Sequence, residues 1–269
     1  MRSRAVTRLA VPAALLLVVF GATSAYAGGS LSNGALVTGT TTQQYSYTTQ
    51  YDYWSVTAVQ PTATSDYDLT LYDAGGAPLA SSTYGEGVTD FVAVDSNSGT
   101  RPFQTYYPNV NLYSAGSYWV QAQYGARTVT LPTPTHHGTT GFSDPDIAFI
   151  TLNSDDVVSI ADIYLTAGQS FWAVSPSAAS QLYLLEADTT HPSTFVQSRY
   201  AATLRLHTQV TDNCTLYTAT ATGWHALVLV KDAPPTVTNP VQGIAYGLHQ
   251  YDSTQPNYCP MANFPAATP

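Results

Sequence analysis

The fold of this chain is decided by the stretch SDYDLTLYDAGG, residues 65–76. Leu69 and Leu71 alternate with less apolar neighbours, which is the period of a β-strand that buries one face. The run then ends in Asp73 and two glycines. Aspartate can bond its own backbone and glycine tolerates a positive φ, so a tight turn follows the predicted strand.

Alternating segments of the same kind occur along the rest of the chain, and they predict further strands. They lie at residues 53–59, 88–94, 117–124, 157–165, 170–174, 181–188 and 222–231. Tyr, Thr and Val are abundant, with 20 tyrosines in 269 residues, and these residue types suit a pleated, half-exposed surface. The fold class is therefore predicted to be all-β.

The two halves of the chain repeat the same order of motifs. Trp54-Ser55-Val56 corresponds to Trp172-Ala173-Val174, and the segments that start at Leu69 and Ala115 correspond to those at Leu182 and Thr222. The offsets are 118 (172 − 54), 113 (182 − 69) and 107 (222 − 115) residues, a slow drift that loops of unequal length would produce. A period near 110 is too long for a solenoid and favours two similar β-sandwiches over one continuous β-domain.

Composition sets the expected boundaries of these domains. The linker, residues 131–141, contains two prolines and two glycines. The predicted segments are a signal peptide at 1–27, a flexible arm at 28–39, a β-sandwich at 40–130, the linker, a second β-sandwich at 142–233 and a proline-rich tail at 234–269.

The N-terminal segment predicts export. Three arginines precede an apolar run from Leu9 to Phe20, and Ala25-Tyr26-Ala27 fits the small-x-small cleavage rule, so Gly28 is the expected mature N-terminus. An uncleaved membrane anchor is the alternative, but the run is short for a span. We expect a secreted, extracellular protein without a membrane span in the mature chain.

Charge excludes several classes of partner. Cleavage removes three of the eight basic residues, so the mature chain carries five against seventeen acidic ones, a formal charge of 5 − 17 = −12. Nucleic acids and anionic membrane surfaces both need clustered cations, so neither is an expected partner.

The two cysteines of the chain are Cys214 and Cys259. An isolated pair in an exported protein most simply forms one disulfide, which would tie the tail to the second domain. A metal site would need more ligands than this pair provides.

The first half resembles the bacterial pre-peptidase C-terminal domain family, whose relatives include collagen-binding domains of secreted collagenases. The match lies in Asp66-Tyr67-Asp68-Leu69-Thr70-Leu71-Tyr72-Asp73 and Ala115-Gly116-Ser117-Tyr118-Trp119-Val120, and it covers residues 40–125. The second half diverges, because Ser180-Gln181 replaces the acidic start of the central strand. The resemblance implies two tandem jelly-roll-like antiparallel β-sandwiches that are non-catalytic and commonly accompany a protease.

Two acidic groups suggest a calcium site, because hard cations bind several carboxylate oxygens. One comprises Asp66, Asp68 and Asp73, and the other comprises Asp144, Asp146, Asp155 and Asp156. Some members of the resembled family hold calcium near the N-terminal segment of the domain. The alternative is structural: the first two acids cap a strand and Asp73 makes an Asx turn. No other cofactor is expected.

No catalytic motif is evident. The mature chain lacks a G-x-S-x-G elbow and an H-E-x-x-H helix, and its glutamates are Glu86 and Glu186 alone. Tyrosines provide the stronger functional hypothesis, because an aromatic ring with a polar tip makes a good contact surface. The proposed binding face comprises Tyr45, Tyr47, Tyr51, Tyr53, Tyr106 and Tyr107.

The sequence thus predicts a secreted, non-catalytic protein that binds an extracellular polysaccharide or protein surface. Two alternatives stay open. One is a secreted hydrolase or protease-associated factor, and the other is a structural component of the envelope or matrix.

Overall fold

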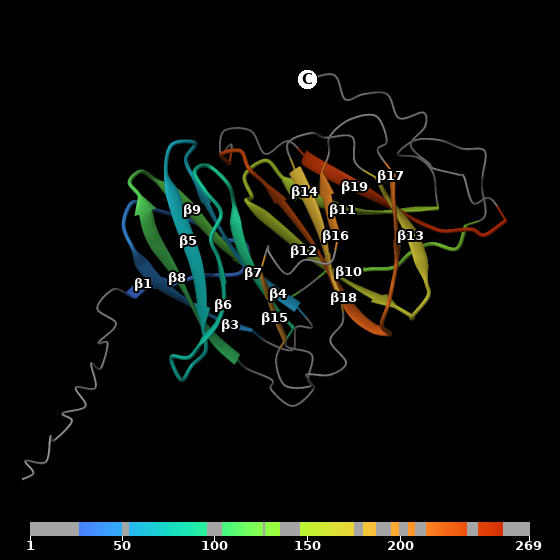
Figure 1. Ribbon diagram of the computed structural model, residues 1–269, viewed down its shortest axis with the longest axis horizontal. Coiled ribbons are helices and arrows are strands. Elements are labelled where there is room, and N and C mark those ends of the chain that lie inside the picture. The colour runs from blue at the N-terminus through green and yellow to red at the C-terminus, as the bar shows by residue number, and fades with distance from the viewer. Residues whose placement is uncertain are drawn as a thin grey trace, which may run out of the picture.

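The computed structural model describes residues 27–49, 54–95, 104–125, 127–134, 146–174, 180–186, 195–198, 204–207, 214–235 and 242–254. These residues form nineteen strands and no helix, arranged in four sheets (Figure 1). The predicted all-β class is confirmed. None of these segments is a helix long and apolar enough to cross a membrane.

The first sandwich consists of two five-stranded sheets. Sheet I has the order β1 (Ala27–Ser30), β3 (Gln43–Thr49), β8 (Gln104–Ser114), β5 (Asp66–Tyr72) and β6 (Pro78–Ser82). Sheet II has the order β15 (Phe195–Ser198), β7 (Asp90–Asp95), β4 (Trp54–Pro61), β9 (Tyr118–Gln123) and β2 (Leu36–Gly39).

The second sandwich repeats this plan. Sheet III has the order β10 (Arg127–Val129), β12 (Val158–Leu165), β18 (Gly223–Lys231), β14 (Ser180–Leu185) and β16 (Leu204–His207). Sheet IV has the order β11 (Ile147–Asn153), β19 (Gln242–Gln250), β13 (Ser170–Val174) and β17 (Cys214–Thr218).

The two sandwiches share one topology, strand for strand. The orders β3-β8-β5-β6 and β7-β4-β9-β2 of the first become β12-β18-β14-β16 and β17-β13-β19-β11 in the second. The first strand of each sandwich is also equivalent. β1 pairs in parallel with β3, and β10 pairs in parallel with β12. Two four-stranded antiparallel sheets connected in this way form a jelly roll, so the predicted fold is confirmed twice in one chain.

The topology also corrects one motif of the repeat. The Trp54 and Trp172 segments are β4 and β13, and the Leu69 and Leu182 segments are β5 and β14, as predicted. The third pairing is wrong, because the Ala115 segment leads into β9 whereas the Thr222 segment leads into β18, the counterpart of β8. The counterpart of β9 is β19.

The two cores have different compositions. Between sheets I and II, buried tyrosines pack with valine and leucine: Tyr45, Tyr47, Tyr67, Tyr106 and Tyr118. Between sheets III and IV, leucine predominates. The tyrosine hydroxyls find partners inside: those of Tyr45 and Tyr118 lie 2.9 Å apart, and the Tyr67 hydroxyl donates to the Gly116 carbonyl at 2.8 Å. Burial raises the pKa of all three phenols, so they stay neutral.

A third core joins the sandwiches through sheets II and III. Trp54, Val56 and Phe91 of the first sandwich pack against Tyr183 and Val228 of the second, and all are fully buried. Phe91 and Tyr183 meet edge to face with ring centroids 5.0 Å apart. The four sheets therefore stack as continuous layers in the order I, II, III, IV.

A strand also crosses from one sandwich to the other. β15 lies in sequence between β14 and β16 of the second sandwich, but it pairs antiparallel with β7 of the first. Gln197 faces Ala93 in this pairing, and Val196 faces Val94. The second half thus supplies an edge strand to the first.

Three predicted segments differ from the observed ones. The flexible arm at 28–39 contains β1 and β2. The tail at 234–269 contains β19, which lies between β11 and β13 and places Tyr246 and Leu248 in the core. β10, expected in the first domain, belongs to the second.

Close packing explains the glycines of the supposed arm. A Cβ on Gly28 would lie 2.7 Å from the Tyr45 ring, and one on Gly39 would lie 2.2 Å from the Tyr118 ring. These glycines let the backbone of an edge strand approach a buried ring, and they do not indicate flexibility.

Candidate functional site

The predicted tyrosine face is only partly placed on the surface. Tyr45, Tyr47 and Tyr106 are each 1% exposed and point into the core, so they do not form a contact surface. The prediction for these three is wrong because tyrosine suits a core as well as a surface when its hydroxyl finds a partner. Tyr51 and Tyr53 lie outside the described residues.

Tyr107 does lie on the solvent-facing side of sheet I. It is the cross-strand partner of Tyr72 on β5, and both side chains are half-buried. Their neighbours Leu71 and Pro108 face the core, which fixes the two tyrosines on the opposite side. Neither phenol hydroxyl has a hydrogen-bond partner within the described chain.

Small polar side chains surround this pair on the same face. Thr70 pairs with Asn109, and its hydroxyl accepts from the Asn111 amide at 3.3 Å and bonds the Ser81 hydroxyl at 3.0 Å. Beyond the pair, the hydroxyls of Thr48 and Thr105 lie 2.9 Å apart. We call this surface, Tyr72 and Tyr107 with their polar neighbours, the sheet I face.

The acids of the first group do not converge. The Asp73 carboxylate accepts the N–H groups of Gly75 and Ala77, each at 2.8 Å, which is the Asx turn of the structural alternative. Asp66 is buried, and its Oδ1 has no hydrogen-bond partner. Burial, and then the charge of Glu86, raise the pKa of Asp66. Asp68 lies next to it on β5, where burial and the Asp66 charge raise its pKa as well.

The second acidic group is also dispersed. Asp146 is buried just before β11, and Asp144 lies outside the described residues. Over the described part of the chain, no three His, Cys, Asp or Glu side chains gather in a way that could hold a metal ion. Cys214 lies on β17 and Cys259 lies outside the described residues, so their disulfide stays a prediction.

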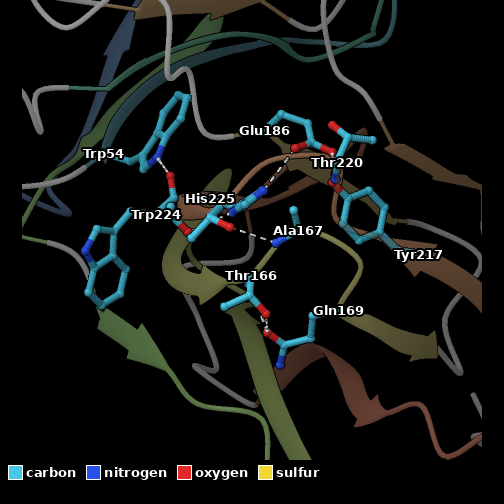
Figure 2. Close-up of polar contacts among 11 residues, drawn as sticks. Trp54, Thr166, Ala167, Gln169, Glu186, Tyr217, Thr220, Trp224 and His225 are labelled. Carbon is cyan, nitrogen blue, oxygen red and sulfur yellow. Dashed lines mark hydrogen bonds and ion pairs between the residues drawn. The ribbon is translucent and has the colours of Figure 1, made fainter.

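A polar network that the sequence did not indicate lies in the second sandwich (Figure 2). Glu186 follows β14, and its carboxylate accepts from the Tyr217 hydroxyl of β17 and from the Thr220 N–H at 3.4 Å. Its other oxygen lies 3.0 Å from Nε2 of His225 on β18. The histidine side chain is 0% exposed and that of Glu186 is 15% exposed.

Both ring nitrogens of His225 face acceptors. Nδ1 lies 3.0 Å from the Gly223 carbonyl, and Nε2 faces the Glu186 carboxylate. Both nitrogens are therefore engaged by neighbouring groups of the protein, and the Nε2 side faces a carboxylate. Burial alone would raise the pKa of Glu186, but the hydrogen bonds from Tyr217 and His225, the charge of His225 and the Thr220 N–H together lower it. The Glu186 charge in turn adds to burial in raising the pKa of Tyr217.

This network ties three strands together, and both ring nitrogens of His225 have a neighbour within it. A general base must come within reach of a substrate, and the His225 side chain is fully enclosed. The sequence could not reveal the network, because its members are separated by 31 and 39 residues and no motif links them.

Comparisons with known proteins leave the family open. No family model and no curated protein matches the chain. Among solved structures, a CUB1-EGF-CUB2 fragment of human MASP-1/3 aligns at 7% identity over 82% of this chain and 94% of its own, with a TM-score of 0.22. A candidate secreted protein from Eubacterium rectale aligns at 11% identity over 81% of this chain and 74% of its own, with a TM-score of 0.17. Structural similarities this low support no conclusion about function.

Proposed function

We propose that this chain is an exported, non-catalytic protein that binds a neutral extracellular polysaccharide through the sheet I face. The observation that carries the proposal is the cross-strand pair Tyr72 and Tyr107, whose hydroxyls are unbonded on an otherwise polar sheet surface. An aromatic ring offers an apolar surface for the C–H groups of a sugar and a polar tip for its hydroxyls.

The form of the face favours an extended polymer. Neighbouring strands lie about 4.8 Å apart and residues i and i+2 about 6.8 Å apart, so the face offers a regular grid of contacts along the sheet. Thr70, Asn109 and Asn111 add donors and acceptors beside the rings. The excess of acidic residues favours a neutral polymer over an anionic one.

The proposed absence of catalysis is supported by the state of His225 beside Glu186. His225 is committed to two acceptors and is enclosed. Export rests on the N-terminal segment, and the protein recovered from culture medium should begin at Gly28.

The test is a pull-down of the purified protein with insoluble cellulose, chitin and bacterial cell wall. At least one of them should retain the wild type, and the double variant Tyr72→Ala/Tyr107→Ala should lose at least about tenfold in affinity, since each ring contributes about 1 kcal/mol. Tyr164→Ala is the matched control, because Tyr164 is 51% exposed but lies on β12 of the other sandwich.

Equal retention of the double variant and the wild type would refute the role of the sheet I face. Binding to a collagen resin alone, with none to the three polysaccharides, would replace the polysaccharide with a protein partner.

A further inference from the structure

A second candidate site lies where the two sandwiches meet. A cleft of about 310 Å³ is lined by Asn33, Gln123 and Tyr124 of the first sandwich and by Thr151, Asp156 and Ser159 of the second. Clefts between domains are common places for small ligands, and volumes from roughly 300 Å³ upward suffice. The site is separate from the sheet I face, because its residues come from other strands.

The carboxylate in the cleft is fixed before any ligand arrives. Gln121 donates from Nε2 to Asp156 Oδ1 at 2.5 Å, while its Oε1 accepts the Val157 N–H at 3.0 Å. Asn153 donates to the other oxygen of Asp156 at 2.9 Å. Each carboxylate oxygen keeps a further lone pair and can accept a hydrogen bond from a ligand. Because the side chain is already held in place, binding does not cost the conformational entropy of ordering it.

Tyr124 lines the cleft, and its ring is anchored in the first core. Its ring stacks on Tyr47, with centroids 5.5 Å apart and an interplanar angle of 14°. Its hydroxyl donates to the Leu31 carbonyl at 3.2 Å, and its N–H donates to Asn33 at 2.9 Å. Both ends of the residue are held, so this side of the cleft keeps a fixed shape.

Several polar groups of the cleft have no partner in the described chain. They are Nε2 of Gln123 and the hydroxyls of Thr151 and Ser159. Gln123 is oriented by its other amide atom, which accepts the Ile160 N–H at 3.3 Å. The cleft therefore presents donors and acceptors together, the pattern that a polyhydroxylated molecule matches.

Charge narrows the class of ligand. No lysine or arginine is among the described residues that line the cleft, so an anion has no counter-charge there. The nearby Lys231 ammonium is already engaged by the carbonyls of Asn153 and Ser154, at 3.4 and 2.5 Å. Burial lowers the pKa of Lys231, while the charges of Asp156 and Asp155 oppose that effect, so this lysine partly balances the acids. An added cation therefore gains little.

We propose that the cleft binds a single neutral sugar unit, whose hydroxyls contact Asp156, Gln123, Thr151 and Ser159. The inference does not depend on the proposed function: the sheet I face would hold a polymer, and the cleft would hold a monosaccharide.

The experiment is calorimetric titration of the full mature chain with glucose, galactose, mannose and N-acetylglucosamine, with glucuronate and putrescine as charged probes. One or more of the neutral sugars should bind, and both charged probes should bind more weakly. The variant Thr151→Val/Ser159→Ala should weaken sugar binding about tenfold, since it removes two ligand hydrogen bonds of roughly 0.5–1.5 kcal/mol each and no bond within the protein.

The matched control is Thr70→Val/Ser81→Ala, the same two exchanges on the sheet I face, which should leave cleft binding unchanged. Tyr72→Ala/Tyr107→Ala should also retain it, so failure of one site is distinguishable from failure of the other. The inference is overturned if none of the four sugars binds, if putrescine binds more tightly than all of them, or if the Thr151/Ser159 variant binds as wild type.

Discussion

One acidic position of the repeat serves two different structural roles. Asp73 follows β5 and Glu186 follows β14, at equivalent places in the two sandwiches. The short Asp73 side chain reaches its own turn, where it accepts two backbone N–H groups. The longer Glu186 side chain reaches β17 and β18 instead and pairs with His225. One added methylene changes a local turn into a link among three strands.

We predict that Glu186→Gln lowers the free energy of unfolding at pH 7 by about 1–3 kcal/mol, because buried His225 loses its carboxylate. The Glu186 pKa is lowered in the folded state, so the carboxylate stabilises the fold above its unfolded pKa of about 4.3, and this stabilisation is lost as pH falls through the lower folded pKa. The difference between wild type and variant should therefore shrink in acid, as measured by urea unfolding from pH 7 to pH 3.

The control for this prediction is Glu86→Gln, which changes the other glutamate of the chain at an exposed position. It should not lower stability at pH 7. A difference between Glu186→Gln and wild type that stays constant down to pH 3 would show that the carboxylate charge is not what stabilises the network.

The sequence could not separate buried from exposed tyrosines. On β3, Tyr45 and Tyr47 alternate with polar residues, so either face of the strand could have been the buried one. Residues distant in sequence determine which face of β3 is buried. Tyr45 contacts Tyr118, and Tyr47 contacts Tyr106 and Tyr124. The sheet I face depends equally on the register of β5 against β8, which places Tyr72 beside Tyr107.

At the scale of elements, strands with a clear alternation were predictable, whereas the leading edge strands β1 and β10 and the central strand β19 were not. β4, β5, β12 and β13 show the alternation that burial imposes on one face. β1 and β10 are held by parallel backbone pairing at a sheet edge, which leaves little trace in the side chains. Pro108 lies within β8, at the point where the pairing of β3 with β8 is interrupted, so its missing N–H costs no ladder bond on that side.

β15 provides a test at this scale, because it joins the two sandwiches by backbone pairing with β7. Successive N–H groups of a strand point to opposite sides, so one of the two variants Val196→Pro and Gln197→Pro must remove a donor to β7. That variant should increase amide hydrogen exchange along Asp90–Asp95 and leave β13 unchanged.

Val196→Ala and Gln197→Ala are the paired controls, since they shorten the side chain and keep the N–H. Unchanged exchange along β7 in both proline variants would mean that β15 does not protect this edge.

At the scale of the whole molecule, the interface between sandwiches was not predictable. Every residue of β4 is buried, because one face packs in the first core and the other against the second sandwich. Its sequence, WSVTAVQP, places Ser55, Thr57 and Gln60 among the apolar residues, and this resembles a strand with one solvated face. Trp54 even donates across the interface, from Nε1 to the Trp224 carbonyl at 3.0 Å (Figure 2). The repeat therefore suggests two independent modules, whereas their shared core makes one body.

This shared core predicts that the two sandwiches unfold together. Wild-type protein should show a single calorimetric transition with equal calorimetric and van't Hoff enthalpies. Phe91→Ala/Tyr183→Ala removes the aromatic pair that spans the interface, so it should split the transition in two. Phe171→Ala is the control: Phe171 is buried inside the second sandwich alone, so its loss should lower the midpoint, at a cost of about 3–5 kcal/mol, and keep one transition. Two transitions in the wild type would instead mean that the interface is too weak to couple the sandwiches.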